Sequence, residues 1–170
     1  WFLHGIKNIF PEYWDRFNSF LPKDERKELL SSYYKRLINN DPKINSEAAV
    51  AWARYEANCS TLLPNASVSE EFVNIQMALN LARIEAHYFV NNLFLEEGQL
   101  LKNIHNIKNI NGHIIQGRYD AICPPESAYD LANAWPNATL QIVEKAGHSS
   151  LEEPIQKALL ETMNSIKKTF

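Results

Sequence analysis

Apolar residues recur at helical spacing through the first hundred positions of the chain. Polar and proline-containing breaks divide them, which predicts three helices, at residues 22–38, 46–59 and 69–91. Ser46 is the expected N-cap of the second helix, and Ser67 or Ser69 is the expected N-cap of the third. The pattern indicates that residues 1–100 are amphipathic helices packed on one another.

The pattern changes after Gly98. Short apolar runs at 113–117 and 139–143 are typical of buried strands, and each is followed by a segment of helical periodicity. The order strand, helix, strand, helix predicts an α/β arrangement of two parallel strands with crossover helices. We therefore expect a boundary near residue 100, with residues 1–100 all helical and residues 101–170 carrying the strands.

Composition and charge narrow the class of protein. The 170 residues are 45% hydrophobic with a net charge of −3, which fits one globular core and excludes a strongly basic nucleic-acid surface. No apolar run reaches the roughly 18 residues of a membrane helix. The two cysteines form no disulfide framework, so we expect a reducing, cytoplasmic setting. The chain opens with Trp1 rather than Met, and we expect a piece of a longer chain.

Asp120 and His148 follow the two predicted strands. Because parallel neighbouring strands end at the same edge of a sheet, both side chains are expected at that edge. A carboxylate that accepts the imidazole N–H fixes the tautomer and leaves the other nitrogen as a general base. Alternatively, Asp120 caps the helix that starts near Pro124 and His148 is a surface residue. The pair at matching strand ends favours catalysis.

Two glutamates continue apolar stripes in the helical half. Glu56 and Glu85 each belong to a stripe whose apolar members recur at helical spacing, and these are Ala49, Trp52 and Ala53 for Glu56 and Ala78, Leu81, Ala82 and Phe89 for Glu85. A buried carboxylate is costly unless a cation meets it, so the two could converge on one cation. Alternatively, each pairs with a nearby base, for which Arg54, Arg83 and His87 are the candidates.

Several short motifs stand out along the chain. Gly-Arg-Tyr-Asp followed by Cys-Pro lies at residues 117–124 and Ala-Gly-His-Ser at 146–149, and further motifs lie at 10–14, 51–56 and 82–89. Together they resemble the proline iminopeptidase (prolyl aminopeptidase) family of α/β-hydrolases. The first motif is the most specific, whereas Ala-Gly-His-Ser is shared more widely among such hydrolases. The last three resemble the helical cap of that family, so the similarity covers nearly the whole chain.

The resemblance implies the C-terminal portion of an α/β-hydrolase fold, preceded by a helical cap or lid. Residues 1–100 correspond to the cap, and residues 101–170 to part of the catalytic domain. Asp120 and His148 correspond to the acid and base of a Ser-His-Asp triad, with no metal and no cofactor.

The resemblance also implies the substrate. In that family, cap glutamates in comparable contexts hold the free α-amino group, so Glu56 and Glu85 would bind the ammonium of a peptide with an N-terminal proline. Phe89 and Tyr88 are candidates for the proline pocket. Phe2 stands where the family usually has a tyrosine.

The motif of the attacking serine does not occur in this sequence. Gly-x-Ser-x-Gly needs glycines four residues apart, and no two of the five glycines have that spacing. We therefore expect the chain to be inactive alone. Three situations stay open: a separate N-terminal half, self-association through strand edges, or stability carried by the cap helices.

Other functions also stay open at this point. A non-catalytic binding or assembly fragment needs no nucleophile, and an esterase or epoxide hydrolase would share the fold without needing two cap carboxylates. Neither a nucleic acid nor a membrane is an expected partner.

Overall fold

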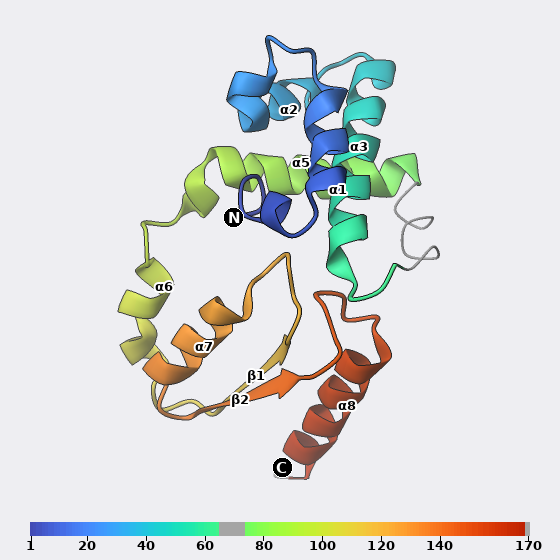
Figure 1. Cartoon of the computed structure of the whole chain (residues 1–170). Helices are drawn as coiled ribbons and strands as arrows, with labels where there is room; N and C mark the ends of the chain where they lie inside the picture. The colour runs from blue at the N-terminus through green and yellow to red at the C-terminus, as the bar shows by residue number, and fades with distance from the viewer. Residues whose placement is uncertain (65–73, 169–170) are drawn as a thin grey trace. The chain divides into compact units, whose positions relative to one another are not determined.

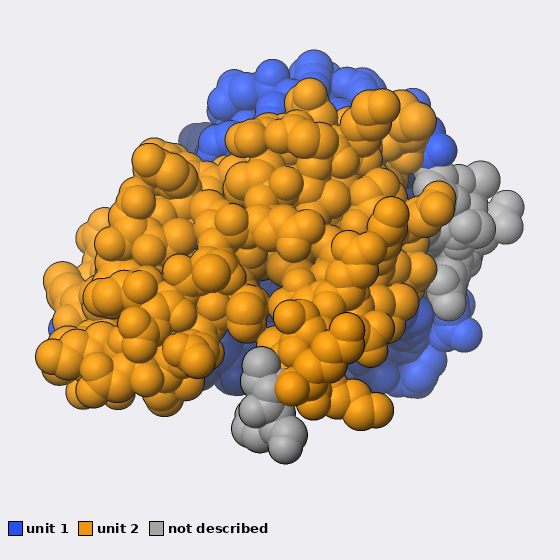
Figure 2. Space-filling model, turned by 90° about the horizontal axis from the view of Figure 1, so that it is seen from below, with its two compact units in different colours: residues 1–59, 64–96 blue, residues 60–63, 97–170 orange. Residues whose placement is uncertain are grey.

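The computed structural model describes residues 1–64 and 74–168. The chain forms two compact units, coloured separately in Figure 2. The first unit contains residues 1–59 and 64–96, and the second contains 60–63 and 97–170. The proposed N-caps Ser67 and Ser69 lie outside the described residues. No helix in the described ranges has the length and apolar character needed to cross a membrane.

The first unit is helical, as predicted (Figure 1). Its α-helices are α1 (Pro11–Phe20), α2 (Leu29–Leu37), α3 (Pro42–Ser60) and α5 (Ile75–Val90). Short 3-10 turns occur at η1 (Ile6–Asn8), η2 (Arg26–Glu28) and η3 (Asn92–Phe94). The periodicity did not predict α1, which begins with Pro11 at a position where a missing N–H costs nothing.

The predicted start of α3 was wrong by one turn. The helix begins at Pro42, and the Asp41 carboxylate accepts the backbone N–H of Lys43 at 2.8 Å. Ser46 therefore lies inside the helix, where its hydroxyl donates to the carbonyl of Pro42. Proline ends a helix that precedes it but is well suited to the first turn of one that follows. The segment 39–42 therefore separates α2 from α3 and also begins α3.

Stacked aromatic rings form the core of the first unit. Phe17 stacks on Tyr33 and Tyr55 at centroid distances of 4.2 and 4.5 Å, and Trp52 meets Phe17 edge-on at 5.7 Å. Trp52 and Tyr33 are completely buried. The Tyr33 hydroxyl donates to the Phe17 carbonyl, which satisfies its buried polar group. This cluster holds α1, α2 and α3 together, and α3 is the helix that carries Glu56.

The second unit contains the strands. β1 (Gly112–Gly117) pairs in parallel with β2 (Ala138–Val143), and α7 (Pro125–Ala134) is the crossover between them (Figure 1). α6 (Gln99–Lys102) and η4 (Ile104–Asn106) precede β1, and α8 (Glu153–Lys167) follows β2. The mixed α/β order and the parallel pairing are confirmed.

The two faces of the sheet pack against different elements. Ile115 of β1 and Val143 of β2 pack with Ile155 and Ala158 of α8. Gly112 lies three residues before Ile115 and therefore on the opposite face of β1. It packs against the ring of Trp135, which follows α7. Successive residues of a strand point to opposite faces, so each face of the sheet has an element packed against it. The strands are less buried than the sequence predicts, because His113, Thr139 and Gln141 are exposed.

Candidate active site

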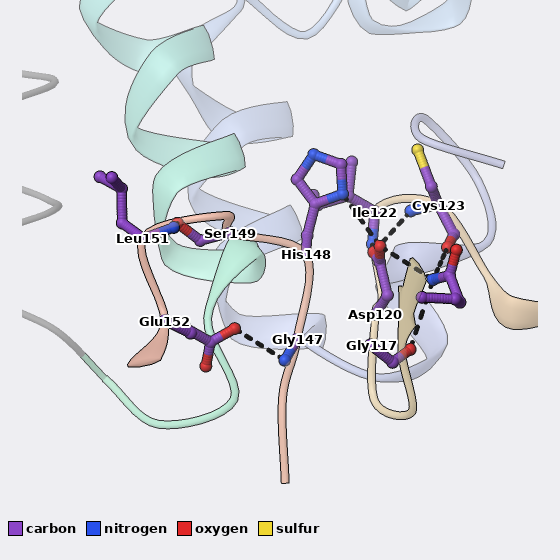
Figure 3. A network of polar contacts seen from close by, with 10 residues as sticks. Gly117, Asp120, Ile122, Cys123, Gly147, His148, Ser149, Leu151 and Glu152 are labelled. Carbon is purple, nitrogen blue, oxygen red and sulfur yellow. Dashed lines mark hydrogen bonds and ion pairs between the residues drawn. The ribbon is translucent and has the colours of Figure 1, made fainter. Parts of the chain in front are cut away.

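The carboxyl ends of the two strands bring Asp120 and His148 together. Asp120 lies three residues after β1 and His148 lies five residues after β2, and His148 Nδ1 donates to Asp120 Oδ2 at 3.0 Å (Figure 3). The aspartate side chain is 7% exposed and the histidine side chain 35% exposed. The placement expected for both residues at one sheet edge therefore holds, and they contact each other directly.

Asp120 is held by its own loop as well as by the histidine. Its Oδ1 accepts the backbone N–H groups of Ile122 and Cys123 at 3.0 and 2.8 Å. Its Oδ2 accepts the side-chain amide of Gln116 at 3.1 Å in addition to the imidazole. Asp120 thus caps its loop and orients His148 at once, whereas the N-cap of α7, Pro124, has no side-chain cap. With its acceptor sites occupied, this carboxylate has one fixed orientation.

His148 has a strongly altered proton affinity. The hydrogen bond to Asp120, followed by the interaction with the Cys123 side chain, raises the pKa of His148 to about 10, although burial opposes the shift. An imidazolium beside a carboxylate is stabilised, and this is the charge that a general base acquires when it takes a proton.

The loop that carries His148 packs on the loop that carries Asp120 through glycines. The Tyr119 N–H donates to the Ala146 carbonyl at 2.9 Å. A Cβ on Gly117 would lie 1.9 Å from the Gly147 carbonyl oxygen, so only glycine permits this approach. Lys145 adopts a left-handed φ of 58° where the chain turns away from β2. The backbone geometry therefore fixes the separation of the acid and the base.

A second carboxylate holds the other side of the histidine loop. Glu152 Oε2 accepts the Gly147 N–H at 2.7 Å (Figure 3), and Oε1 accepts the Leu62 N–H at 2.9 Å. The carbonyl of Ser60 accepts the N–H groups of His148 and Ser149 at 2.8 and 2.9 Å. Residues 60–63 and the histidine loop are thereby tied together.

Glu56 and Glu85 lie in the first unit. Glu56, on α3, is buried at 9% exposure, and Glu85, on α5, is half-buried. Glu85 Oε2 accepts the indole N–H of the fully buried Trp52 at 2.7 Å. Trp52 precedes Glu56 by four residues and therefore shares its helix face. Of the apolar residues in the two stripes, Leu81 and Phe89 are half-buried and the others are buried.

The bases considered as partners of Glu85 have other contacts. Arg83 donates through Nε to the Leu37 carbonyl at 2.7 Å, and His87 Nδ1 lies 3.4 Å from the Tyr34 hydroxyl. Within residues 1–64 and 74–168 neither of them, nor Arg54, forms an ion pair with Glu85. The donor that the structure records for Glu85 is therefore the neutral indole N–H of Trp52.

Aromatic rings flank the indole that binds Glu85. Phe2 stacks on Trp52 at 5.4 Å and lies 5.6 Å from Phe89. Tyr88, the other candidate for the proline pocket, contacts the rings of His87 and Phe94 instead.

Sequence reasoning missed three polar groups that hold these residues: Gln116, Glu152 and Trp52 as a donor. Gln116 and Glu152 carry no motif of their own, although Glu152 precedes Pro154 at the start of a helix, where an acidic residue is common. Cys123, whose backbone N–H donates to Asp120, is exposed. Across the described ranges, no three His, Cys, Asp or Glu side chains gather as a metal site would require.

Comparison with known proteins gives consistent relatives. The chain is 43% identical to a proline iminopeptidase of Xylella fastidiosa over 154 residues, which cover 89% of this chain and 49% of that protein. It is 42% identical to one of Xanthomonas citri over 166 residues (94% and 52%) and 40% identical to one of Arabidopsis thaliana over 170 residues (98% and 45%). No protein-family model matches. The chain spans about half the length of these relatives, and along nearly all of its own length it is a homologue of the proline iminopeptidases.

Proposed function

We propose that this chain is the cap and C-terminal catalytic segment of a serine aminopeptidase that releases N-terminal proline from peptides. The observation that carries the proposal is the Asp120–His148 hydrogen bond, at the carboxyl ends of parallel strands, in a homologue of proline iminopeptidases. In this proposal residues 1–100 are the helical cap of an α/β-hydrolase and residues 101–170 are part of its catalytic domain. The two free cysteines fit a reducing, cytoplasmic setting.

His148 would act as the general base and Asp120 as its orienting acid. With Nδ1 held by Asp120, Nε2 is the nitrogen that takes the proton of the attacking serine hydroxyl and then gives it to the departing amine. A base must be neutral before it reacts, and the pKa of His148 is raised to about 10 by Asp120 and Cys123. Activity is therefore expected to rise with pH above neutrality.

Glu56 and Glu85 would hold the α-ammonium of the substrate. Glu85 is half-buried and accepts an N–H that carries no charge, so a substrate ammonium would bring the opposite charge to it, and Glu56 lies buried on the helix face that it shares with Trp52. A free amine at that place restricts the reaction to the first residue of an unblocked peptide. Phe89 and Phe2, which flank the Trp52 indole, are suited to the apolar proline ring.

The serine and the oxyanion donors would come from sequence outside this chain. Triad members act as a unit, so the 170-residue chain is expected to show no turnover of proline p-nitroanilide. A chimera tests the segment directly: this chain replaces the aligned half of the Xanthomonas citri proline iminopeptidase. We expect turnover in the chimera, and a loss of about 10³-fold or more in His148→Ala and Asp120→Asn.

The amine anchor is tested in the same chimera. Glu56→Gln and Glu85→Gln should lower kcat/KM for proline p-nitroanilide, whereas Glu153→Gln, an exposed glutamate on α8, should not. Normal turnover in both cap variants would remove the anchor, and full activity in His148→Ala would remove the triad. A chimera that folds but does not turn over substrate would contradict the catalytic proposal.

Calorimetry of the 170-residue chain with proline amide separates a second candidate. Binding without hydrolysis, in a chain whose chimera is inactive, would favour a non-catalytic binding module. Glu56 and Glu85 would then serve recognition alone.

A further inference from the structure

We propose that Glu152 is a positioning residue for His148, acting through the backbone on either side of the histidine loop. The inference rests on the proposed function of His148, but its geometry is independent of any substrate. The Glu152 carboxylate joins Gly147, the residue before the histidine, to Leu62 in the segment that follows α3.

The side chain of Glu152 is directed at this loop and not at its own helix. Glu152 is the N-cap of α8, yet it makes no side-chain hydrogen bond to that helix. Its two oxygens instead accept hydrogen bonds from the N–H groups of Gly147 and Leu62, at 2.7 and 2.9 Å. Neither bond is required for α8 to form, so their effect is on the loop.

The loop is closed on both sides of the histidine. On the far side, the N–H groups of His148 and Ser149 donate to the Ser60 carbonyl. The Glu152 N–H donates to the Ser149 carbonyl at 3.1 Å, and the Leu151 N–H donates to the Ser149 hydroxyl at 3.2 Å. Residues 147–152 therefore form a compact turn whose two ends are fixed by segment 60–62 and by one carboxylate.

A carboxylate suits this role better than any neutral side chain. Two backbone N–H groups need two acceptors, and an amide in the same place would offer one oxygen and one competing donor. Hydrogen bonds to an ionised acceptor are also shorter and stronger, and the start of α8 favours negative charge. Loss of this clamp would let the backbone of Gly147 shift, and His148 Nδ1 would leave the line to Asp120 Oδ2.

The experiment measures the His148 titration by nuclear magnetic resonance in the whole 170-residue chain. In the wild type we expect His148 to titrate near pH 10, with Nδ1 protonated. Glu152→Gln should lower this pKa by about one unit or more, toward its ordinary value of about 6.5. Glu153→Gln removes the same charge one residue away, from an exposed side chain, and should leave the titration unchanged.

A double-mutant cycle separates positioning from a direct effect of charge. If Glu152 acts by aligning His148 with Asp120, then Glu152→Gln should not alter the His148 pKa further once Asp120→Asn is present. A through-space effect of the lost charge would persist in that background and would overturn the proposal. Thermal unfolding of each variant identifies any that is not folded, and Glu152→Asp, which keeps the charge but shortens the reach, serves as a second test.

The outcomes distinguish this inference from the proposed function. An unchanged His148 titration in Glu152→Gln and Glu152→Asp overturns the positioning role while leaving the triad intact. If His148 of the wild type titrates near 6.5, both the Asp120–His148 pair and the positioning role of Glu152 are overturned. Correct titrations with an inactive chimera leave the positioning role standing and reject the peptidase.

Discussion

At the scale of single residues, the site depends on side chains whose partners are fixed. Asp120 is nearly buried and accepts hydrogen bonds from two backbone N–H groups, from Gln116 and from His148. His148 is partly exposed, so its ring remains accessible on the side away from Asp120. The aspartate thus has little freedom to leave the histidine, and the pair should be detectable through its titration.

The raised pKa of His148 predicts a pH-dependent stability. Because the folded chain binds this proton more tightly than the unfolded chain, the stabilisation is present in full below the unfolded pKa of about 6.5. It is lost as pH rises toward the folded value of about 10. The free energy of unfolding in urea should therefore differ most between wild type and Asp120→Asn at pH 6, and the difference should shrink by pH 10. A difference independent of pH would contradict the pair.

The indole of Trp52 offers a second test at this scale. Trp52→Phe removes a buried donor to the Glu85 carboxylate and leaves a small void, which should lower the free energy of unfolding by about 2 to 4 kcal/mol. Trp14→Phe is the matched control, because Trp14 donates to the neutral carbonyl of Leu3 and is half-buried. Its loss should be smaller, and equal losses in urea titrations would show that the charged acceptor adds nothing.

At the scale of elements, β1 and β2 form a two-stranded sheet in the part of the chain that the structure describes, with α7 and α8 packed against it. Each strand pairs with the other along one of its two edges. The register aligns Gly112 with Ala138 and Gly117 with Val143. The N–H groups of Gly112 and Arg118 donate to Asn137 and Val143, so even-numbered residues of β1 bond toward β2. Odd-numbered residues present their backbone groups to the other edge.

Amide hydrogen exchange should alternate along β1. Ile114 and Gln116 bond toward β2 and should exchange slowly. The register directs the N–H groups of His113 and Ile115 to the other edge, so these two should exchange faster. Slow exchange at all four would show that a further strand occupies this edge, as self-association through strand edges requires, and dilution of the sample would then restore the alternation.

At the scale of the whole molecule, the chain divides into two units that bury their cores separately. The first is built on stacked aromatic rings, and the second on aliphatic residues between the sheet and α8. Each unit contains one of the two cysteines. The thiols can therefore report on the units one at a time.

Thiol labelling should separate the two units. Cys123 is exposed and should react with a disulfide reagent at once, whereas burial raises the pKa of Cys59 to about 12 and leaves it 2% exposed. Cys59 should react only as urea unfolds the first unit. Cys59→Ser assigns the slow phase, and fast labelling of both thiols in native buffer would contradict the burial of Cys59.

Periodicity and turn residues made much of this architecture predictable. Apart from α1, the α-helices of the first unit, the two strands and the last helix follow from spacing, because burial of one face imposes a period of 3.6 or 2. The start of α3 was not predictable, since proline both ends and begins helices. The partners of Glu85 were not predictable either, because the nearest bases in sequence point elsewhere and the donor, Trp52, lies on another helix.

The order and lengths of strand, helix and strand, which can be read along the chain, place Asp120 and His148 at neighbouring carboxyl ends of the sheet whatever the details of packing. The contacts that hold the two residues there are visible only in three dimensions. Gln116, the close approach of Gly117 to Gly147, and the Glu152 carboxylate act across loops, where backbone N–H groups of distant segments need acceptors. Such pairings depend on three-dimensional proximity and leave no period in the sequence, because each loop backbone takes whichever acceptor folding brings within reach.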